Sequence, residues 1–305
     1  MKKKKQTSSP SILVLGATGM LGRTVYAFLL AKWPETTWGT SQKKDGFLFF
    51  DAYSPEKSLK NIEKRLGKID YIINCIGLLR TVHKEASEPT RIDFIEINSL
   101  FPLKLASYCV KKNIRFLHMS TDAVFGGKAG LVNEKTQISP SGDYAISKAL
   151  GEPQAPNCLS IRASIVGCDP REKKGLIELV RIGDKLKGFS NQLFSGCTVL
   201  QLARFYADLI EEKRFDRLRS RTKVLHFTPL LLSKDKLLKD IALVFEVKSR
   251  ILSIKAAETI TRKLTSLYVS PRKLARYGTT ATTVLSELKM FEENLKYLQE
   301  KRKKV

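Results

Sequence analysis

The stretch from Ser11 to Trp33, "SILVLGATGMLGRTVYAFLLAKW", restricts the fold of this 305-residue chain more than any other feature. A short apolar run is followed at once by glycines at positions 16, 19 and 22, and then by apolar residues at helical spacing. Glycine permits a tight turn, a close approach of the backbone to a phosphate, and close packing of a helix on a strand. The stretch therefore predicts a strand, a glycine turn and a helix whose N-terminus binds a pyrophosphate, with a plain tight turn as the alternative.

Apolar runs typical of buried strands alternate with helical segments as far as residue 167. Strands are expected at 12–15, near 37–40, and within 47–52, 69–77, 114–120 and 158–167; helices are expected over 55–66, 90–113 and 142–152. The strand runs are continuously apolar rather than alternating, which is typical of a parallel sheet covered on both faces. The predicted fold class is α/β, with a doubly wound parallel sheet.

The pattern changes after residue 167. Amphipathic helices are expected over 176–186, 198–215 and 233–246, with loops between them. This indicates a smaller, mainly helical C-terminal lobe that covers the carboxyl edge of the sheet and binds substrate. The predicted organisation is a basic tail (1–11), an NAD(P)-binding domain (12–168), a substrate-binding lobe partly interleaved with the sheet (169–298) and a second basic tail (299–305).

Composition argues against several classes of protein. No apolar run approaches the roughly 20 residues that cross a bilayer, and no signal-peptide apolar region precedes Ile12, so we expect a soluble, cytoplasmic protein without membrane insertion. Cysteines and histidines are scattered and form no CxxC pair, which predicts neither a disulfide framework nor a metal site. They are Cys75, Cys109, Cys158, Cys168 and Cys197, with His83, His118 and His226. His118, within "RFLHMS", is expected to be a strand residue rather than a catalyst.

The net charge of +24 is the feature that favours a nucleic-acid partner. The basic residues are nevertheless spread along the chain, and no zinc-finger spacing or aromatic RNA-binding signature accompanies them. An anionic small substrate explains the charge as well. We therefore expect no nucleic-acid partner.

The end of the second predicted strand bears on the choice of cofactor. A carboxylate there would bond the ribose 2′-hydroxyl of NAD and repel a 2′-phosphate. The stretch reads "GTSQKKDG", so Ser41, Lys43 and Lys44 precede the first acid, Asp45. Hydroxyl and ammonium groups suit a phosphate. NADP(H) is therefore favoured, NAD(H) stays open, and ordinary loop charges are the alternative explanation.

Tyr144 and Lys148 lie four residues apart in a predicted helix and therefore share one face. A nearby ammonium is expected to lower the pKa of the phenol from about 10, which makes it a better proton donor or acceptor. Thr121 ends a predicted parallel strand, where ligands collect in this architecture. Its hydroxyl is placed to bond a substrate carbonyl that Tyr144 protonates. A solvated helix face is the alternative for the pair.

Seven motifs together resemble the extended short-chain dehydrogenase/reductases. They are "GATGMLG", "INCIG", "ASEP", "IEIN", "STDAVFGG", "YAISKALGE" and "IRAS", and the resemblance runs from Ile12 to about Leu298. Within this family the chain looks most like the dTDP-4-dehydrorhamnose reductase group and its nucleotide-sugar relatives. The resemblance implies a Rossmann-like fold and NADPH-dependent reduction of the 4-keto group of a nucleotide-activated deoxysugar, for the synthesis of cell-surface polysaccharide sugars. A homodimer is left open.

The resemblance also implies roles for single residues. Thr121, Tyr144 and Lys148 match the catalytic group, and Asn98 matches the helix asparagine that supports it. Expected cofactor contacts are Gly16, Thr18, Gly19, Met20, Leu21 and Gly22 around the pyrophosphate, Ser41, Lys43, Asp51 and Ala52 around the adenosine, and Cys75, Ile76, Gly77, Asn98, Tyr144 and Lys148 along the remaining cofactor. Expected substrate contacts are Thr121, Asp122, Arg162 and Asn191.

Two departures weaken the assignment to dTDP-rhamnose itself. Ile165 stands where the rhamnose enzymes carry an aromatic residue, and "NCIGLLR" replaces an alanine-rich segment. A related deoxy- or acetamido-sugar nucleotide is therefore a further candidate. Epimerases and dehydratases of the same superfamily stay open as alternatives, although Ala123 follows Asp122 where dehydratases pair two acids. A non-catalytic NADP-binding regulatory subunit is the third alternative.

Overall fold

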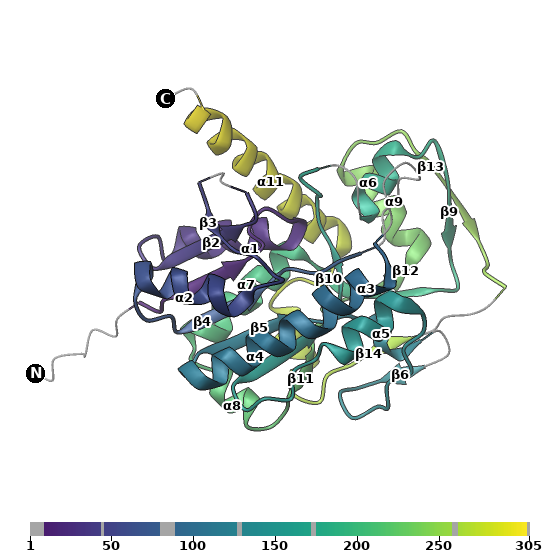
Figure 1. Ribbon diagram of the computed structural model, residues 1–305. Helices are drawn as coiled ribbons and strands as arrows, with labels where there is room; N and C mark the ends of the chain where they lie inside the picture. Colours follow the sequence, from purple (N-terminus) through teal and green to yellow (C-terminus); the bar gives the residue numbers. More distant parts are fainter. Residues whose placement is uncertain are drawn as a thin grey trace, which may run out of the picture.

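A seven-stranded, wholly parallel sheet forms the centre of the computed structural model (Figure 1). The structure describes residues 9–43, 46–79, 89–126, 130–171, 175–257 and 262–303, the last without the side chains of 297–303. The strand order is β11-β7-β5-β4-β1-β2-β3. These strands are β1 (Ile12–Leu15), β2 (Thr37–Ser41), β3 (Leu48–Phe49), β4 (Tyr71–Asn74), β5 (Arg115–Met119), β7 (Cys158–Arg162) and β11 (Val224–His226). The predicted α/β class with a parallel sheet is confirmed.

Helices cover both faces of the sheet. The apolar side chains of α1 (Met20–Lys32) and α7 (Val199–Glu211) pack on one face, and those of α2 (Pro55–Leu66) and α4 (Phe101–Lys112) pack on the other. The strands between them are fully buried, which explains why their sequences are apolar throughout. Residues 199–226 supply both α7 and the edge strand β11, so this part of the chain returns to the sheet from beyond residue 169.

The predicted helix over 90–113 is present and contains a π-helical turn. Helix α3 (Arg91–Ile95) continues through the turn η1 (Glu96–Leu100) into α4. Pro102 has no N–H to donate to the carbonyl of Asn98, four residues earlier. Gly151, which ends helix α5 (Gly142–Leu150), packs against that carbonyl: a Cβ at Gly151 would lie 1.8 Å from it. The π turn and the glycine therefore fit α5 closely against the preceding helix.

The remaining elements are short sheets and helices. The three small sheets are β12-β10-β8, β13-β9 and β14-β6, from strands β6 (Leu131–Val132), β8 (Ser164–Val166), β9 (Lys185–Phe189), β10 (Leu193–Thr198), β12 (Leu230–Ser233), β13 (Arg250–Ile254) and β14 (Lys263–Leu264). The helices are α6 (Leu176–Ile182), α8 (Phe215–Arg219), α9 (Lys234–Val244), α10 (Pro271–Ala275), α11 (Ala281–Lys303) and the 3-10 turn η2 (Asp122–Phe125). Helix α8 lies at the amino edge of the central sheet, where its Asp216 pairs with Arg115 at the start of β5. Figure 1 shows α11 projecting beyond the sheet toward the C-terminus.

Two predicted elements differ from the structure. The single strand expected over 158–167 divides at Ala163, because β7 pairs with β5 in the central sheet whereas β8 pairs with β10 in a small one. The helix expected over 176–186 ends at Ile182, and β9 begins at Lys185. Between them a Cβ at Gly183 would lie 2.6 Å from the Leu186 side chain, so the chain turns there without room for a side chain.

Among the described residues, no helix combines the length and the apolar character that crossing a membrane requires.

Replacing Gly151 by Ala is expected to destabilise the protein, because the added Cβ would collide with the Asn98 carbonyl. We expect the free energy of unfolding to fall by about 1–3 kcal/mol. Gly130→Ala is the matched control, since a Cβ added there would meet nothing within 4 Å and its backbone is not in the left-handed region. Urea unfolding measures both variants; equal stabilities would show that this contact is not tight.

Candidate active site

Several sequence-predicted residues lie at the carboxyl edge of the sheet, at or just after the end of a strand. Gly16 follows β1, Ser41 ends β2, Cys75 follows β4 and Thr121 follows β5 by two residues. Strand β1 lies between β2 and β4, so the direction in which successive strands are added reverses beside it. A crevice outside the carboxyl ends at such a reversal is where open α/β sheets bind ligands.

The glycine turn leaves the start of α1 open to an anion. Gly16 has a φ of 77°, and a Cβ at Gly22 would lie 2.0 Å from the Gly16 carbonyl oxygen, so both positions require glycine. Gly19 caps α1 and provides no side chain to accept from the first N–H groups. These groups and the helix dipole make the turn a suitable cradle for a phosphate.

Asn98, in the π turn, joins two of the segments that carry predicted site residues. Its Oδ1 accepts from the Leu78 N–H at 2.8 Å, while its Nδ2 donates to the Leu78 carbonyl at 3.1 Å and to Ser147 Oγ on α5 at 3.2 Å. A Cβ at Gly77 would lie 3.5 Å from Asn98 Oδ1 and 3.9 Å from Lys148 Nζ. The segment after β4 therefore lies directly beside Lys148, and glycine keeps that space open.

Tyr144 and Thr121 are brought together as the sequence predicts. The phenol of Tyr144 lies near the Thr121 side chain, and its ring packs edge-on against Phe94 with the centroids 6.4 Å apart. Burial raises the pKa of Tyr144 to about 12; the Thr121 side chain opposes this rise and the Asp122 carboxylate adds to it.

Lys148 is buried one helical turn from Tyr144, and its Nζ donates to the Met119 carbonyl at the end of β5. Burial lowers the pKa of Lys148 to about 8, and the Glu152 carboxylate opposes this fall. The prediction that Lys148 lowers the pKa of Tyr144 is therefore not met. The ammonium is directed to the strand carbonyl, and burial dominates the pKa of the phenol.

Asp122 is tightly held beside Thr121. Its Oδ1 accepts from Ser164 Oγ at 2.6 Å, and its Oδ2 accepts from Arg262 Nη2 at 2.9 Å. Neither Ser164 nor Arg262 was predicted from the sequence. Arg262 lies 140 positions beyond Asp122 and belongs to no motif, so no local pattern could have identified it.

Arg162 and Asn191, predicted to meet the substrate, have intramolecular partners. Arg162 donates through Nε and Nη2 to the Glu152 carboxylate at 2.7 and 2.6 Å, and both side chains are almost fully buried. Asn191 exchanges two hydrogen bonds with the backbone of Ala256. Their contacts with a substrate stay predictions. Glu152 was not singled out, although it ends the "YAISKALGE" motif.

The predicted adenosine contacts follow β2 and β3. Ser41 Oγ accepts from the Lys43 N–H at 3.0 Å, and Asp51 Oδ1 accepts from the Tyr53 N–H at 3.0 Å. Lys44 and Asp45 lie outside the described residues, as do His83 and the terminal segments 1–8 and 304–305. His118 is a buried residue of β5, as expected, and contacts Asn74 through Nδ1. The described residues contain no group of three or more His, Cys, Asp or Glu side chains that could hold a metal ion.

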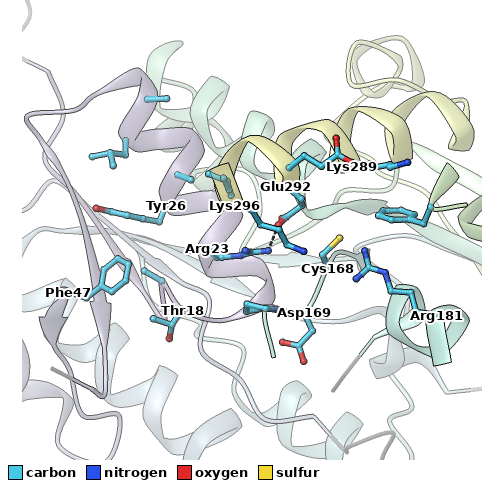
Figure 2. A pocket seen from close by; sticks show the side chains of 18 residues that line it. Thr18, Arg23, Tyr26, Phe47, Cys168, Asp169, Arg181, Lys289, Glu292 and Lys296 are labelled. Carbon is cyan, nitrogen blue, oxygen red and sulfur yellow. Dashed lines mark hydrogen bonds and ion pairs between the residues drawn. The ribbon is translucent and has the colours of Figure 1, made fainter. Parts of the chain in front are cut away.

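A pocket of about 700 Å³ lies beside the glycine turn, between α1, α11 and the loop around Asp169 (Figure 2). Thr18 is the predicted site residue on its wall; Thr121, Tyr144 and Lys148 do not line it. Arg23 of α1 pairs with the buried Glu292 of α11 there, and Thr24 Oγ1 donates to Glu292 at 3.1 Å. Neither α11 nor this ion pair was predicted from the sequence.

Known proteins similar to this chain include sugar-nucleotide reductases. Residues 12–158 match the model of the NAD dependent epimerase/dehydratase family. A probable low-salt glycan biosynthesis reductase of Haloferax volcanii is 31% identical over 103 residues, which are 32% of this chain and 33% of that protein. A dTDP-4-dehydrorhamnose reductase of Mycobacterium tuberculosis is 28% identical over 149 residues, 47% of this chain and 45% of that protein. The chain thus spans less than half the length of these curated relatives.

Solved structures share the fold over nearly the whole chain. A dTDP-4-dehydrorhamnose reductase of Clostridium acetobutylicum has a TM-score of 0.67 at 18% identity, covering 92% of this chain and 99% of that one. A dTDP-4-dehydrorhamnose reductase of Bacillus anthracis in complex with NADP has a TM-score of 0.67 at 18% identity, over 94% and 100% of the two chains. A dTDP-glucose 4,6-dehydratase of the same organism in complex with NAD has a TM-score of 0.66 at 16% identity, over 94% and 97%.

The parallel sheet, its strand order and the glycine turn define a Rossmann-like α/β protein. Residues 12–158, just under half of the chain, match the NAD dependent epimerase/dehydratase family, and this match confirms the resemblance to the extended short-chain dehydrogenase/reductases that the motifs predicted.

The low pKa of Lys148 predicts a dependence of stability on pH. The pKa falls from 10.5 to about 8 on folding, so the unfolded chain binds more protons between these values. The folded state carries a penalty for the buried ammonium below about pH 8, and this penalty disappears as the pH rises toward 10.5. Relative to Lys148→Met, the wild-type protein should therefore gain stability between pH 8 and 10, by at most about 1.4 kcal/mol per pH unit. Urea unfolding of both proteins across this range measures the effect; parallel curves would contradict it.

Proposed function

We propose that this protein is an NADPH-dependent reductase of the 4-keto group of a nucleotide-activated deoxysugar, in the synthesis of cell-surface polysaccharide sugars. The observation that carries the proposal is the proximity of Thr121 and Tyr144, with Lys148 one helical turn away, at the sheet edge where the glycine turn also lies. The sequence relatives, which act as reductases by their names, support the substrate class.

The residues present fit a nicotinamide dinucleotide. The uncapped start of α1 suits the pyrophosphate, and the glycine cradle leaves no room for side chains at positions 16 and 22. Ser41 and Lys43 would meet the adenosine ribose, and Gly77 leaves a gap beside Lys148. When bound in its reduced form, the cofactor would supply a hydride to the keto carbon.

Side chains of the protein would then carry out the proton transfer. Tyr144 would donate its phenolic proton to the carbonyl oxygen as negative charge develops there, and Thr121 would hydrogen-bond the same oxygen. With a pKa near 12, the phenol keeps its proton at neutral pH and is ready to act as an acid. Lys148 would bind the nicotinamide ribose and contribute positive charge while it is protonated.

The environment of Asp122 favours a reductase over a dehydratase. A dehydratase needs a carboxyl group that exchanges protons with the sugar, whereas Asp122 is held by the Arg262 guanidinium and the Ser164 hydroxyl. Ala123 follows it, so the neighbouring position offers no second acid. An epimerase shares the Tyr144–Lys148 arrangement and differs by returning the hydride to its product, which a product assay distinguishes.

Replacing Tyr144 by Phe is expected to remove the proton donor. With NADPH and the keto-sugar nucleotide that the wild-type protein reduces, kcat should fall by at least about a hundredfold. Tyr108→Phe is the matched control, because its hydroxyl donates to Glu63 of α2 and not to a residue of the candidate site, so its loss should leave kcat unchanged. The assay follows NADPH absorbance with dTDP-, UDP- and GDP-linked 4-ketosugars and identifies the product by mass and configuration. NADPH binding without turnover of any of them would favour the non-catalytic alternative.

Lys43 is expected to set the preference for NADP. Lys43→Glu should weaken NADPH binding by about tenfold or more, because a charge-assisted contact with the 2′-phosphate becomes a repulsion. NADH binding should change little. Lys60→Glu, an equal charge change at an exposed position of α2, serves as the control. Fluorescence titration gives both dissociation constants; equal weakening of NADPH and NADH would contradict the assignment.

Three statements stay predictions: the roles of single site residues, the domain boundaries and the homodimer that the sequence leaves open.

A further inference from the structure

Arg262 reaches from the C-terminal part of the chain to the end of strand β5. It precedes β14, which pairs in parallel with β6, and the Lys263 N–H donates to the Gly130 carbonyl at 2.9 Å. This pairing fixes the backbone next to Arg262 beside Gly130. From there the guanidinium donates through Nη2 to Asp122 and through Nη1 to the Gly126 carbonyl.

The Thr121 hydroxyl has a single proton to donate. Its oxygen accepts from the Ala123 N–H at 3.2 Å, which engages one of its two lone pairs. The Asp122 carboxylate, whose Oδ1 lies 3.4 Å away, accepts this proton, and the nearby phenol oxygen of Tyr144 is an alternative acceptor. In the proposed reaction the substrate carbonyl would occupy a third position near the same hydroxyl.

The other hydrogen bonds of Asp122 determine how strongly its carboxylate attracts the Thr121 proton. Ser164 Oγ donates to Oδ1 at 2.6 Å and Arg262 Nη2 donates to Oδ2 at 2.9 Å. Hydrogen bonds between hydroxyl and oxygen are normally 2.5–3.0 Å long, so the 3.4 Å contact from Thr121 is weak. A carboxylate without the guanidinium would be a stronger acceptor and would attract the Thr121 proton, because its charge would be uncompensated.

We propose that Arg262 is a positioning residue for the proposed reduction: by holding Asp122, it keeps the Thr121 proton available to Tyr144 and the substrate oxygen. The proposal rests on the proposed function for its kinetic consequences but not for its structural one. The charge of Arg262 also favours proton donation by Tyr144. The Asp122 charge raises the pKa of Tyr144, and the adjacent guanidinium reduces that influence.

Lys234 is the second cation near this carboxylate. Its pKa is lowered by burial and then by Arg262, and is raised by Asp122, so the three charges influence one another. Lys234 Nζ donates to Gln192 Oε1 at 2.9 Å, whereas Arg262 donates directly to Asp122. The direct hydrogen bond identifies Arg262, rather than Lys234, as the group that orients the carboxylate.

The kinetic test compares Arg262→Gln, which removes the charge, with Arg262→Lys, which retains it. With NADPH and a keto-sugar nucleotide, Arg262→Gln should lower kcat by about tenfold with KM changed less than about threefold, because the donor is misdirected rather than the substrate lost. Arg262→Lys should recover part of kcat. Arg272→Gln, at an exposed position of α10, is the control and should match the wild type. A rise in KM with kcat unchanged would make Arg262 a substrate-binding residue and overturn the proposal.

A double-mutant cycle tests whether Arg262 acts through Asp122. In the Asp122→Asn background no carboxylate remains to be held, so adding Arg262→Gln should lower kcat by less than about twofold. An equal tenfold loss in both backgrounds would overturn the proposal, because Arg262 would then act by another route.

A structural measurement separates this inference from the proposed function. In a crystal structure of Arg262→Gln, the distance from Thr121 Oγ1 to the nearer Asp122 oxygen should shorten from 3.4 Å to about 2.7 Å. An unchanged distance would overturn the inference whatever substrate the protein uses. A shortened distance in a protein that reduces no keto-sugar would instead contradict the proposed function and leave the positioning role of Arg262 intact. If the glutamine variant does not fold, Arg262→Met, which also removes the charge, gives the same measurement with the same two outcomes.

Discussion

The side-chain amide of Asn98 is the contact on which the geometry of the candidate site most depends. It holds the backbone of Leu78 by two hydrogen bonds and Ser147 by a third. Through these bonds it fixes the segment after β4 against the helix that carries Tyr144 and Lys148. Because a Cβ at Gly77 would lie only 3.9 Å from Lys148 Nζ, a small displacement of either segment would change the space beside the ammonium.

The position of Asn98 in turn depends on an irregular helix. The π turn at 96–100 changes the direction of successive side chains relative to a regular α-helix, and such turns are frequent at functional sites. Pro102 leaves the Asn98 carbonyl without its usual helical donor, and Gly151 allows α5 to approach that carbonyl. Asn98 thus fixes α5 in two ways. Its carbonyl sets the distance from α5 to the neighbouring helix, and its side chain sets the distance from α5 to the sheet edge.

The sequence predicts what is local and leaves out what depends on distant partners. Continuous apolar runs and the glycine turn predicted the parallel sheet, and helical spacing placed Tyr144 and Lys148 on one face. The interruption at Ala163 could not be seen, because it depends on which strands pair with β7 and β8. The pKa of Tyr144 was predicted in the wrong direction, since spacing does not reveal that Lys148 bonds the Met119 carbonyl. Arg262 has no sequence signal near Asp122.

Two ion pairs link the C-terminal part of the chain to the two ends of the candidate site. Glu292 of α11 pairs with Arg23, one turn into the helix that follows the glycine turn, and Arg262 pairs with Asp122 beside Thr121. All four side chains are largely buried, and a buried charge that loses its partner is strongly destabilising. The native arrangement therefore requires that α11 and the backbone at Arg262 lie in place together. The position of these C-terminal residues also determines the charge next to Thr121 and Tyr144.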